Sequence, residues 1–231
     1  MKKNYKVIDY NQCKNVDLFS LFSNYKSLIV RNVFSKKEKN LAKKEIINFF
    51  KKKKYNFKNG KKLFHRYDHE PEKAKYKRIM KFASFTFADK AHFSNCTKII
   101  KRSLKIKLMY HSCRKKIFKN EKFKLKFIPR ASYYPCGGGY YEEHNDAFSK
   151  EKILDIIPLS YLTNDFDKGG LHIRSWTKKL INIEKNIKLG DVVFMEAKTN
   201  HYIKPIDKKK NIKAMKKIYK GRFSLISVLD S

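Results

Sequence analysis

The stretch Tyr133–Asp146 (YYPCGGGYYEEHND) is the most informative part of this chain of 231 residues, because it ends in His144 and Asp146. Side chains two residues apart on a strand point to the same face, so an imidazole and a carboxylate with this spacing can bind one ion. His201 follows after enough residues for several strands to bring it back beside them. Two histidines and one carboxylate are typical of a non-haem Fe(II) centre. The sequence therefore predicts a metal site on His144, Asp146 and His201.

The neighbouring segments decide whether this pattern is more than chance. A His-x-Asp triplet also occurs where both residues are ordinary surface side chains that share no site. Here the triplet is followed by four further segments with a recognisable order, namely YLTNDF (161–166), GGL (169–171), GDVVF (190–194) ahead of His201, and GRFSL (221–225). Their presence favours a common site over coincidence.

The second half of the chain has the sequence pattern of an all-β domain. From about Phe123 onward, short runs of apolar and β-branched residues alternate with turn residues, as in a sandwich or barrel. We expect the triple glycine Gly137–Gly139 to form a mobile loop over the metal site. The expected strands are 127–134, 156–163, 171–174, 179–183, 191–195, 201–206 and 222–229.

The first half has a different pattern. Residues 28–34 are an apolar run that predicts a strand, and Ser35 with Glu38 forms a capping box that opens a helix with Ala42 and Ile46 on its buried side. Residues 76–119 are expected to be mostly helical, with Ile99, Ile100, Leu104, Leu108 and Ile117 buried. We therefore expect a single domain, in which a mostly helical support region (1–122) packs on the outside of a β core (123–231).

Taken together, the quoted segments resemble the Fe(II)- and 2-oxoglutarate-dependent dioxygenase superfamily, and most of all its prolyl-hydroxylase-type branch. The resemblance covers Tyr133 to Leu229. It implies a double-stranded β-helix (jelly roll) with Fe²⁺ at one open end, bound by His144, Asp146 and His201. It also implies 2-oxoglutarate as co-substrate, O₂ as oxidant, ascorbate as a candidate reductant, and release of succinate and CO₂ as a second substrate is hydroxylated.

The resemblance also assigns the residues that hold 2-oxoglutarate. Arg222 and Ser224 match the family's Arg-x-Ser pair, and a guanidinium offers two parallel N–H donors to the C5-carboxylate. Arg222 lies farther from His201 than is usual in the family, and the lysine-rich insertion 208–217 accounts for the excess. Tyr161 is expected to hydrogen-bond the same carboxylate and Tyr134 to line the pocket. The alternatives are that Arg222 pairs with a surface acid and that both tyrosines are core residues.

Two positions of this chain indicate which kind of reaction within the superfamily is expected. Halogenases of the superfamily replace the carboxylate ligand with a small residue, whereas Asp146 is present here, which favours hydroxylation. The nucleic-acid-demethylating branch has a second arginine where this chain has Val228. The second substrate stays open between a protein side chain and a small molecule.

The net charge of +35 has two explanations. A basic surface attracts nucleic acid and other polyanions, but most of the basic residues are lysine, as expected for an AT-rich genome, whereas nucleic-acid readers favour arginine. We therefore expect no specific nucleic-acid partner. A non-catalytic jelly-roll protein with a polyanion-binding surface is the alternative to an enzyme.

The remaining expectations concern location. No apolar run is long enough to span a membrane, and no secretory signal follows the basic start of the chain. Cys13, Cys96, Cys113 and Cys136 are scattered without a Cys-x-x-Cys pair, which predicts reduced thiols in a cytoplasmic protein. The oligomeric state is left open by the sequence.

Overall fold

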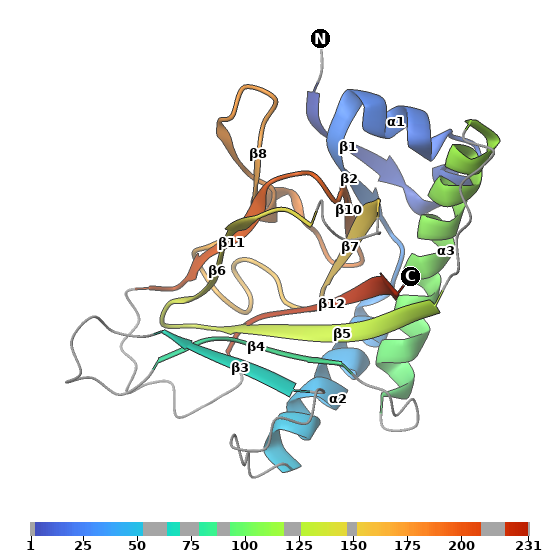
Figure 1. Ribbon diagram of the computed structural model, residues 1–231. Helices are drawn as coiled ribbons and strands as arrows, with labels where there is room; N and C mark the ends of the chain where they lie inside the picture. Colours follow the sequence, from blue (N-terminus) through green and yellow to red (C-terminus); the bar gives the residue numbers. More distant parts are fainter. Residues whose placement is uncertain are drawn as a thin grey trace.

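Two mainly antiparallel sheets and three α-helices form the computed structural model (Figure 1), which describes residues 3–52, 64–69, 79–86, 93–117, 126–146, 152–208 and 220–230. The larger sheet has eight strands in the order β1-β2-β10-β7-β12-β5-β4-β3, and only the β1·β2 pair is parallel. Its strands are β1 (Lys3–Asp9), β2 (Tyr25–Arg31), β3 (Phe64–His69), β4 (Ile79–Thr86), β5 (Lys126–Pro135), β7 (Ile153–Pro158), β10 (Val192–Glu196) and β12 (Gly221–Asp230).

The smaller sheet faces the larger one and has four strands in the order β6-β11-β8-β9. Apolar side chains from both sheets meet in one core, for example Val193 and Ile156 from the larger sheet and Leu171 and Ile203 from the smaller. Two facing sheets of this kind make a jelly roll, so the predicted fold class is confirmed. The strands of the smaller sheet are β6 (Gly139–His144), β8 (Gly170–Arg174), β9 (Leu180–Asn182) and β11 (His201–Ile206).

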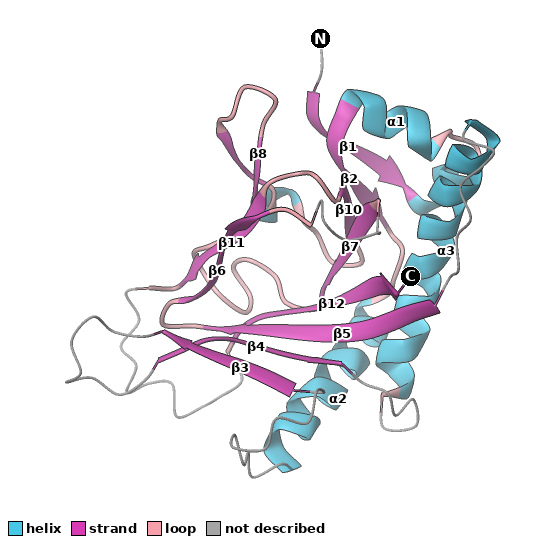
Figure 2. Cartoon of the chain, in the orientation of Figure 1, coloured by secondary structure: helices cyan, strands magenta, loops and turns pink. Residues whose placement is uncertain are grey.

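A second core lies between the larger sheet and the helices α1 (Leu18–Asn24), α2 (Lys36–Lys52) and α3 (Ser94–Ile117), which cover the face turned away from β6 and β8 (Figure 2). Strand β10 shows how one sequence serves both cores. Val192 and Phe194 face the helices, whereas Val193 and Met195 face the smaller sheet. This alternation is the period of two that a strand imposes.

The start of α2 matches the sequence analysis. The Ser35 hydroxyl accepts the backbone N–H of Glu38 at 3.2 Å, and the Glu38 carboxylate accepts the backbone N–H of Ser35 at 2.8 Å. The capping box predicted there is therefore confirmed. Ala42 and Ile46, expected on the buried side of this helix, are both fully buried.

The prediction for residues 76–119 is wrong in its first part, because Ile79–Thr86 forms β4. Strand β4 lies between β5 and β3 and pairs with both, so hydrogen bonding to a distant strand overrides the local pattern. With β1 and β2, these strands extend the larger sheet. The described part of residues 1–122 therefore supplies four strands as well as the helices.

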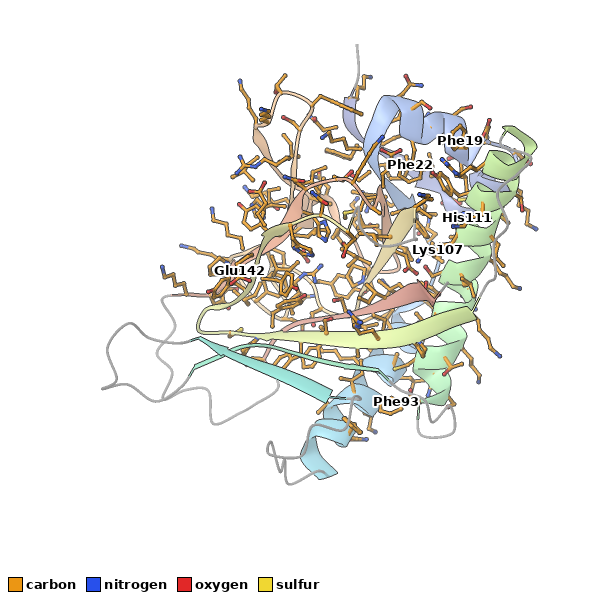
Figure 3. All side chains as sticks on the ribbon, viewed as in Figure 1. Phe19, Phe22, Phe93, Lys107, His111 and Glu142 are labelled. Atoms are coloured by element: carbon orange, nitrogen blue, oxygen red, sulfur yellow. The ribbon has the colours of Figure 1, made fainter. Side chains whose placement is uncertain are left out.

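Helix α3 buries Ile99 and Ile100 as expected, but farther along the helix the buried face differs from the prediction. Leu104 and Leu108 are only partly buried, whereas Ser103 and Lys107, the second of which Figure 3 labels on α3, are completely buried. Both donate to Asp155 of β7, Ser103 at 2.5 Å and Lys107 at 3.1 Å. A buried charge needs a partner of opposite charge, and Asp155 on the sheet supplies it. The expected burial of Ile117 lies outside the described side chains.

The triple glycine does not form a loop over the metal site. Gly137 and Gly138 make the turn between β5 and β6, and Gly138 donates its N–H to the Ile206 carbonyl at 2.8 Å. Gly139 begins β6, and His144 ends it. The turn therefore lies at the opposite end of β6, fixed by a backbone hydrogen bond.

Two further predictions concern the basic insertion and the cysteines. The insertion 208–217 lies outside the described residues after Lys208. None of Cys13, Cys96, Cys113 and Cys136 forms a disulfide. Among the described residues, no helix has the length and apolarity to cross a membrane.

A lysine buried on α2 gives the fold a pH dependence. The Lys39 ammonium is fully buried and donates to the Asp191 carbonyl at 2.6 Å. Burial lowers the pKa of Lys39 from 10.5 to about 7, although the Asp191 carboxylate partly opposes this shift. Between these two values the unfolded chain binds more protons than the folded one, so stability rises with pH across this range.

We expect the difference in the free energy of unfolding between the unmodified chain and Lys39→Met to change with pH. Between about pH 7 and pH 10 it should shift in favour of the unmodified chain by up to about 1 kcal/mol per pH unit. Denaturant titrations at several pH values measure this difference. Lys44→Met, which removes an exposed lysine of the same helix, is the control. Its free energy of unfolding should change with pH in the same way as that of the unmodified chain. A difference for Lys39→Met that does not change with pH would contradict the expectation.

Candidate metal centre

The smaller sheet brings together the three predicted metal ligands. His144 is the last residue of β6, His201 is the first residue of β11, and the two are direct partners in the register of these antiparallel strands. Asp146 follows β6 by two residues, and its backbone N–H donates to the Ala197 carbonyl at 2.8 Å. The ligand atoms of the three side chains all lie within 4.8 Å of one another.

Both imidazoles are oriented by the backbone. Nδ1 of His144 lies 2.8 Å from the Glu142 carbonyl, and Nδ1 of His201 lies 3.0 Å from the Thr199 carbonyl. A carbonyl only accepts, so each Nδ1 carries a proton, and in a neutral ring the lone pair then lies on Nε2. The two Nε2 atoms point at one carboxylate oxygen of Asp146, at 3.9 Å and 3.7 Å. The backbone contact of each Nδ1 is the usual way in which proteins orient histidine ligands.

The electrostatic environment favours neutral imidazole at His201. Burial, and then the neighbouring His144, lower its pKa, while the Thr199 carbonyl and Asp146 oppose the shift. The centre is open on one side, because about a third of the His144 and Asp146 side chains is exposed, against 8% for His201. Two neutral nitrogens and one carboxylate oxygen are the donors that Fe(II) takes in a facial triad, so these residues fit the ion.

Arg222, the predicted anchor for 2-oxoglutarate, is completely buried on β12. Its Nη1 donates to the Ser224 hydroxyl at 3.3 Å, and its guanidinium carbon lies 5.9 Å from the centre of the Tyr134 ring. Burial raises the pKa of Tyr134 to about 12 against the opposing effect of Arg222, so its phenol is neutral. The structure thus brings three of the four predicted co-substrate residues to one place.

The fourth residue, Tyr161, lies beside helix α2. Its hydroxyl donates to the Pro158 carbonyl at 3.4 Å, and the Lys39 ammonium lies 5.6 Å from its ring centre. Burial raises the pKa of Tyr161, which is therefore also a neutral phenol. Its contact with the co-substrate stays a prediction.

Tyr134 and Tyr141 connect the two parts of the site. The two phenols are close enough to influence each other electrostatically, and the Tyr141 ring packs edge-on against His144 with centroids 4.5 Å apart. Tyr134 also contacts Arg222. The anchor and the metal group are therefore linked through two neighbouring aromatic side chains.

One residue of this site was missed by the sequence analysis. Glu184 begins the short helix η2 (Glu184–Asn186) and its carboxylate accepts the Nε–H of Arg222 at 2.9 Å. The sequence alternative placed Arg222 against a surface acid, whereas both side chains of this pair are 1% exposed. An acid between Ile183 and Lys185 gives no local signal that separates a buried carboxylate from an exposed one.

Comparison with known proteins supports the fold. No family model matches the chain, and no curated protein matches it by sequence. Among solved structures it is similar to a Pseudomonas putida prolyl-4-hydroxylase, with TM-score 0.61 and 13% identity over 94% of this chain and 98% of that one. It is also similar to a full-length Neurospora crassa protein in complex with alpha-KG, with TM-score 0.67 and 12% identity over 97% of this chain and 84% of that one.

A third similar structure is the Trichoplax adhaerens prolyl hydroxylase in complex with a hypoxia inducible factor peptide, with TM-score 0.59 and 12% identity over 91% of this chain and 86% of that one. At these identities the likeness shows the fold. The chain has the jelly-roll fold of the 2-oxoglutarate/Fe(II) oxygenases, and it carries a His/Asp/His group. The resemblance read from the sequence is confirmed at this level.

Proposed function

We propose that this protein is an Fe(II)- and 2-oxoglutarate-dependent dioxygenase that hydroxylates a protein side chain or a small molecule. The observation that carries the proposal is the convergence of His144, Asp146 and His201, whose ligand atoms lie within 4.8 Å of one another on a jelly roll. The buried arginine with a second hydrogen-bonding residue, Ser224, supports it independently. The first feature suits a metal ion and the second suits an anion.

Each residue would have a defined role. His144, Asp146 and His201 would hold Fe²⁺, which supplies the oxidative chemistry when it is bound with O₂ and 2-oxoglutarate. Arg222 and Ser224 would bind the C5-carboxylate of 2-oxoglutarate. The neutral phenol of Tyr134 would line the pocket without adding negative charge, and Tyr161 would donate to the same carboxylate.

The second substrate would approach over the exposed edges of His144 and Asp146. The similar proteins do not restrict its class, since one structure of the Neurospora crassa protein contains thymine and the Trichoplax adhaerens enzyme holds a peptide. The proposal includes ascorbate as the reductant. It also places the protein in the cytoplasm, and this location is supported by the four cysteines, none of which forms a disulfide.

Succinate formation tests the proposal. Purified protein with Fe(II), ascorbate and 2-oxoglutarate in air should convert 2-oxoglutarate to succinate slowly without a second substrate, and Asp146→Ala should not. Loss of succinate in the variant alone supports a metal-dependent reaction. No succinate from the unmodified protein, even with mixed peptides and metabolites added, favours the non-catalytic alternative.

The lysine-rich surface of α2 favours polyanion binding as a secondary property. Lys36, Lys37, Asn40, Leu41 and Lys44 line a shallow hollow of about 480 Å³ on this helix. Lysine neutralises phosphate without reading sequence, and the released counterions make such binding strongly dependent on salt.

We expect any nucleic-acid binding by the protein to be independent of sequence and to weaken by at least about tenfold between about 50 mM and 200 mM salt. Fluorescence anisotropy with two unrelated oligonucleotides at several salt concentrations measures it. Tight binding to one of them that persists at high salt would contradict a purely electrostatic surface. Replacing Lys36, Lys37 and Lys44 together with glutamine should weaken binding without altering succinate formation.

A further inference from the structure

The guanidinium of Arg222 already has a charged partner inside the protein. Glu184 accepts its Nε–H at 2.9 Å, and both side chains are 1% exposed. The same carboxylate oxygen also accepts the backbone N–H of Leu171 at 2.7 Å. Glu184 is therefore fixed by the backbone of β8 on one side and holds Arg222 on the other.

The backbone of β8 leaves space for this carboxylate. Gly170 has φ +94°, a conformation that L side chains rarely adopt, and a Cβ atom there would lie 2.4 Å from Cγ of Glu184. A side chain at position 170 would thus collide with Glu184. The strand and the acidic residue fit together only because position 170 is glycine.

One edge of the guanidinium remains available. Nη2 of Arg222 is buried and has no hydrogen-bond partner among the described residues. Oε1 of Glu184 is likewise buried without a hydrogen-bond partner among them. A buried donor without an acceptor is destabilising. Arg222 therefore presents Nη2, next to the Nη1 that reaches Ser224, to an incoming acceptor.

We propose that Glu184 is the resident counterion of Arg222 and determines how selectively this pocket takes a carboxylate. In the ligand-free protein Glu184 balances the buried charge and, by holding the Nε–H, leaves the Nη edge of Arg222 for a ligand. A ligand that ends in a carboxylate meets an arginine whose charge is already balanced, and it is repelled by Glu184. The inference rests on the proposed function, because it concerns the distal carboxylate of 2-oxoglutarate.

The sign of the effect follows from Coulomb's law. Two carboxylates on neighbouring edges of one guanidinium are about 6 Å apart, and at an effective dielectric constant of about 20 their repulsion weakens binding roughly ten- to a hundredfold. Removing the charge of Glu184 should therefore tighten the binding of a dicarboxylate. A residue that only positioned Arg222 would have the opposite effect, because its loss would free the guanidinium to move.

Glu184→Gln is the test, since its amide oxygen can still accept from Leu171 and Arg222. Titration calorimetry on protein loaded with Mn²⁺, which supports binding without turnover, should show 2-oxoglutarate bound at least about tenfold more tightly by the variant. Binding of 2-oxopentanoate, which lacks the distal carboxylate, should change by less than about twofold. Without ligand, the variant should unfold at lower denaturant, because Arg222 is left buried without its counterion.

Glu38→Gln is the matched control, because Glu38 pairs with Arg102 at 2.7 Å in a half-exposed ion pair outside the pocket. It should leave the affinity for both keto acids unchanged. If the unmodified protein binds 2-oxoglutarate and Glu184→Gln binds it equally or more weakly, the counterion role is wrong while the proposed function stands. If neither protein binds 2-oxoglutarate, the proposed function fails and the inference fails with it.

A second variant covers the case in which Glu184→Gln does not fold. The double variant Glu184→Gln/Arg222→Gln buries neither charge, so it should fold where the single variant does not. Circular dichroism and a cooperative unfolding transition report this directly. Failure of the double variant to recover the fold would overturn the proposal, since the defect would then not come from an unbalanced arginine.

Discussion

Arg222→Ala is expected to raise the apparent Michaelis constant for 2-oxoglutarate by roughly 30-fold to several-thousand-fold. Losing one partner of a buried charge pair costs on the order of 2–5 kcal/mol. Arg222 is completely buried and offers an unpartnered Nη2 that suits a carboxylate. Steady-state kinetics of succinate formation at varied 2-oxoglutarate measure the change, and Fe(II) affinity should not alter because no metal ligand is touched.

Two further variants sharpen this expectation. Arg222→Lys should recover only part of the affinity, because one ammonium cannot reproduce the planar fork of a guanidinium. Arg102→Ala removes the half-exposed partner of Glu38 and should leave the Michaelis constant unchanged. An effect of Arg222→Ala within about twofold of the unmodified protein, well under about 1 kcal/mol, would assign the anchor to another residue.

Arg222→Ala also leaves Glu184 buried without its positive partner, so the free energy of unfolding should fall by about 3 kcal/mol or more. Kinetics must therefore be measured at a temperature where the variant is folded. Combining Arg222→Ala with Glu184→Gln should restore part of the stability and none of the affinity. This separation distinguishes a loss of binding from a loss of folded protein.

His201→Ala and His144→Ala are expected to abolish both succinate formation and the weak visible charge-transfer band that Fe(II) and 2-oxoglutarate should give under anaerobic conditions. Each substitution removes one of three ligands, and a site with two protein ligands binds iron weakly. Anaerobic absorption difference spectra, with Fe(II) added to protein and 2-oxoglutarate, measure the band.

His172→Ala is the control for the metal ligands. His172 is also a buried histidine, on the neighbouring strand β8, and its Nδ1 likewise lies 2.9 Å from a backbone carbonyl, that of Gly170. It lies outside the His/Asp/His group, so its replacement should leave the band in place. A band of unchanged strength in His144→Ala and His201→Ala would put the metal elsewhere.

The parts of the fold that follow local rules were predictable. Ser35 and Glu38 are three residues apart, and their reciprocal hydrogen bonds need only a helix start. Except for β6, the strands of the smaller sheet were predicted to within a few residues. Alternation with a period of two and turn residues are both visible in the local sequence. The same period predicted the pairing of His144 with Asp146, but in the structure Asp146 lies two residues beyond the end of β6, where the period of a strand no longer applies.

The errors occur where distant chain segments meet. Ile79–Thr86 has a pattern that also suits a helix, and it becomes β4 because β5 and β3 offer hydrogen bonds on both sides. Lys107 on α3 is buried because Asp155 lies opposite it on β7. The turn at Gly137 and Gly138 is fixed by Ile206, a residue on another strand. In each case the partner that decides the outcome is far away in sequence.

The sequence by itself determined which residue types a metal ion and a dicarboxylate need, because His144 with Asp146 and Arg222 with Ser224 each lie only two residues apart. Only the tertiary structure decided the state of these residues: that His201 and His144 face each other across β6 and β11, and that Arg222 already has Glu184 as a buried counterion. Burial and charge balance are properties of the surroundings, and the surroundings of Arg222 come from β8, η2 and β12 together. A chain pattern cannot specify them, since the energy of a buried charge depends on which distant residue the fold brings to its side.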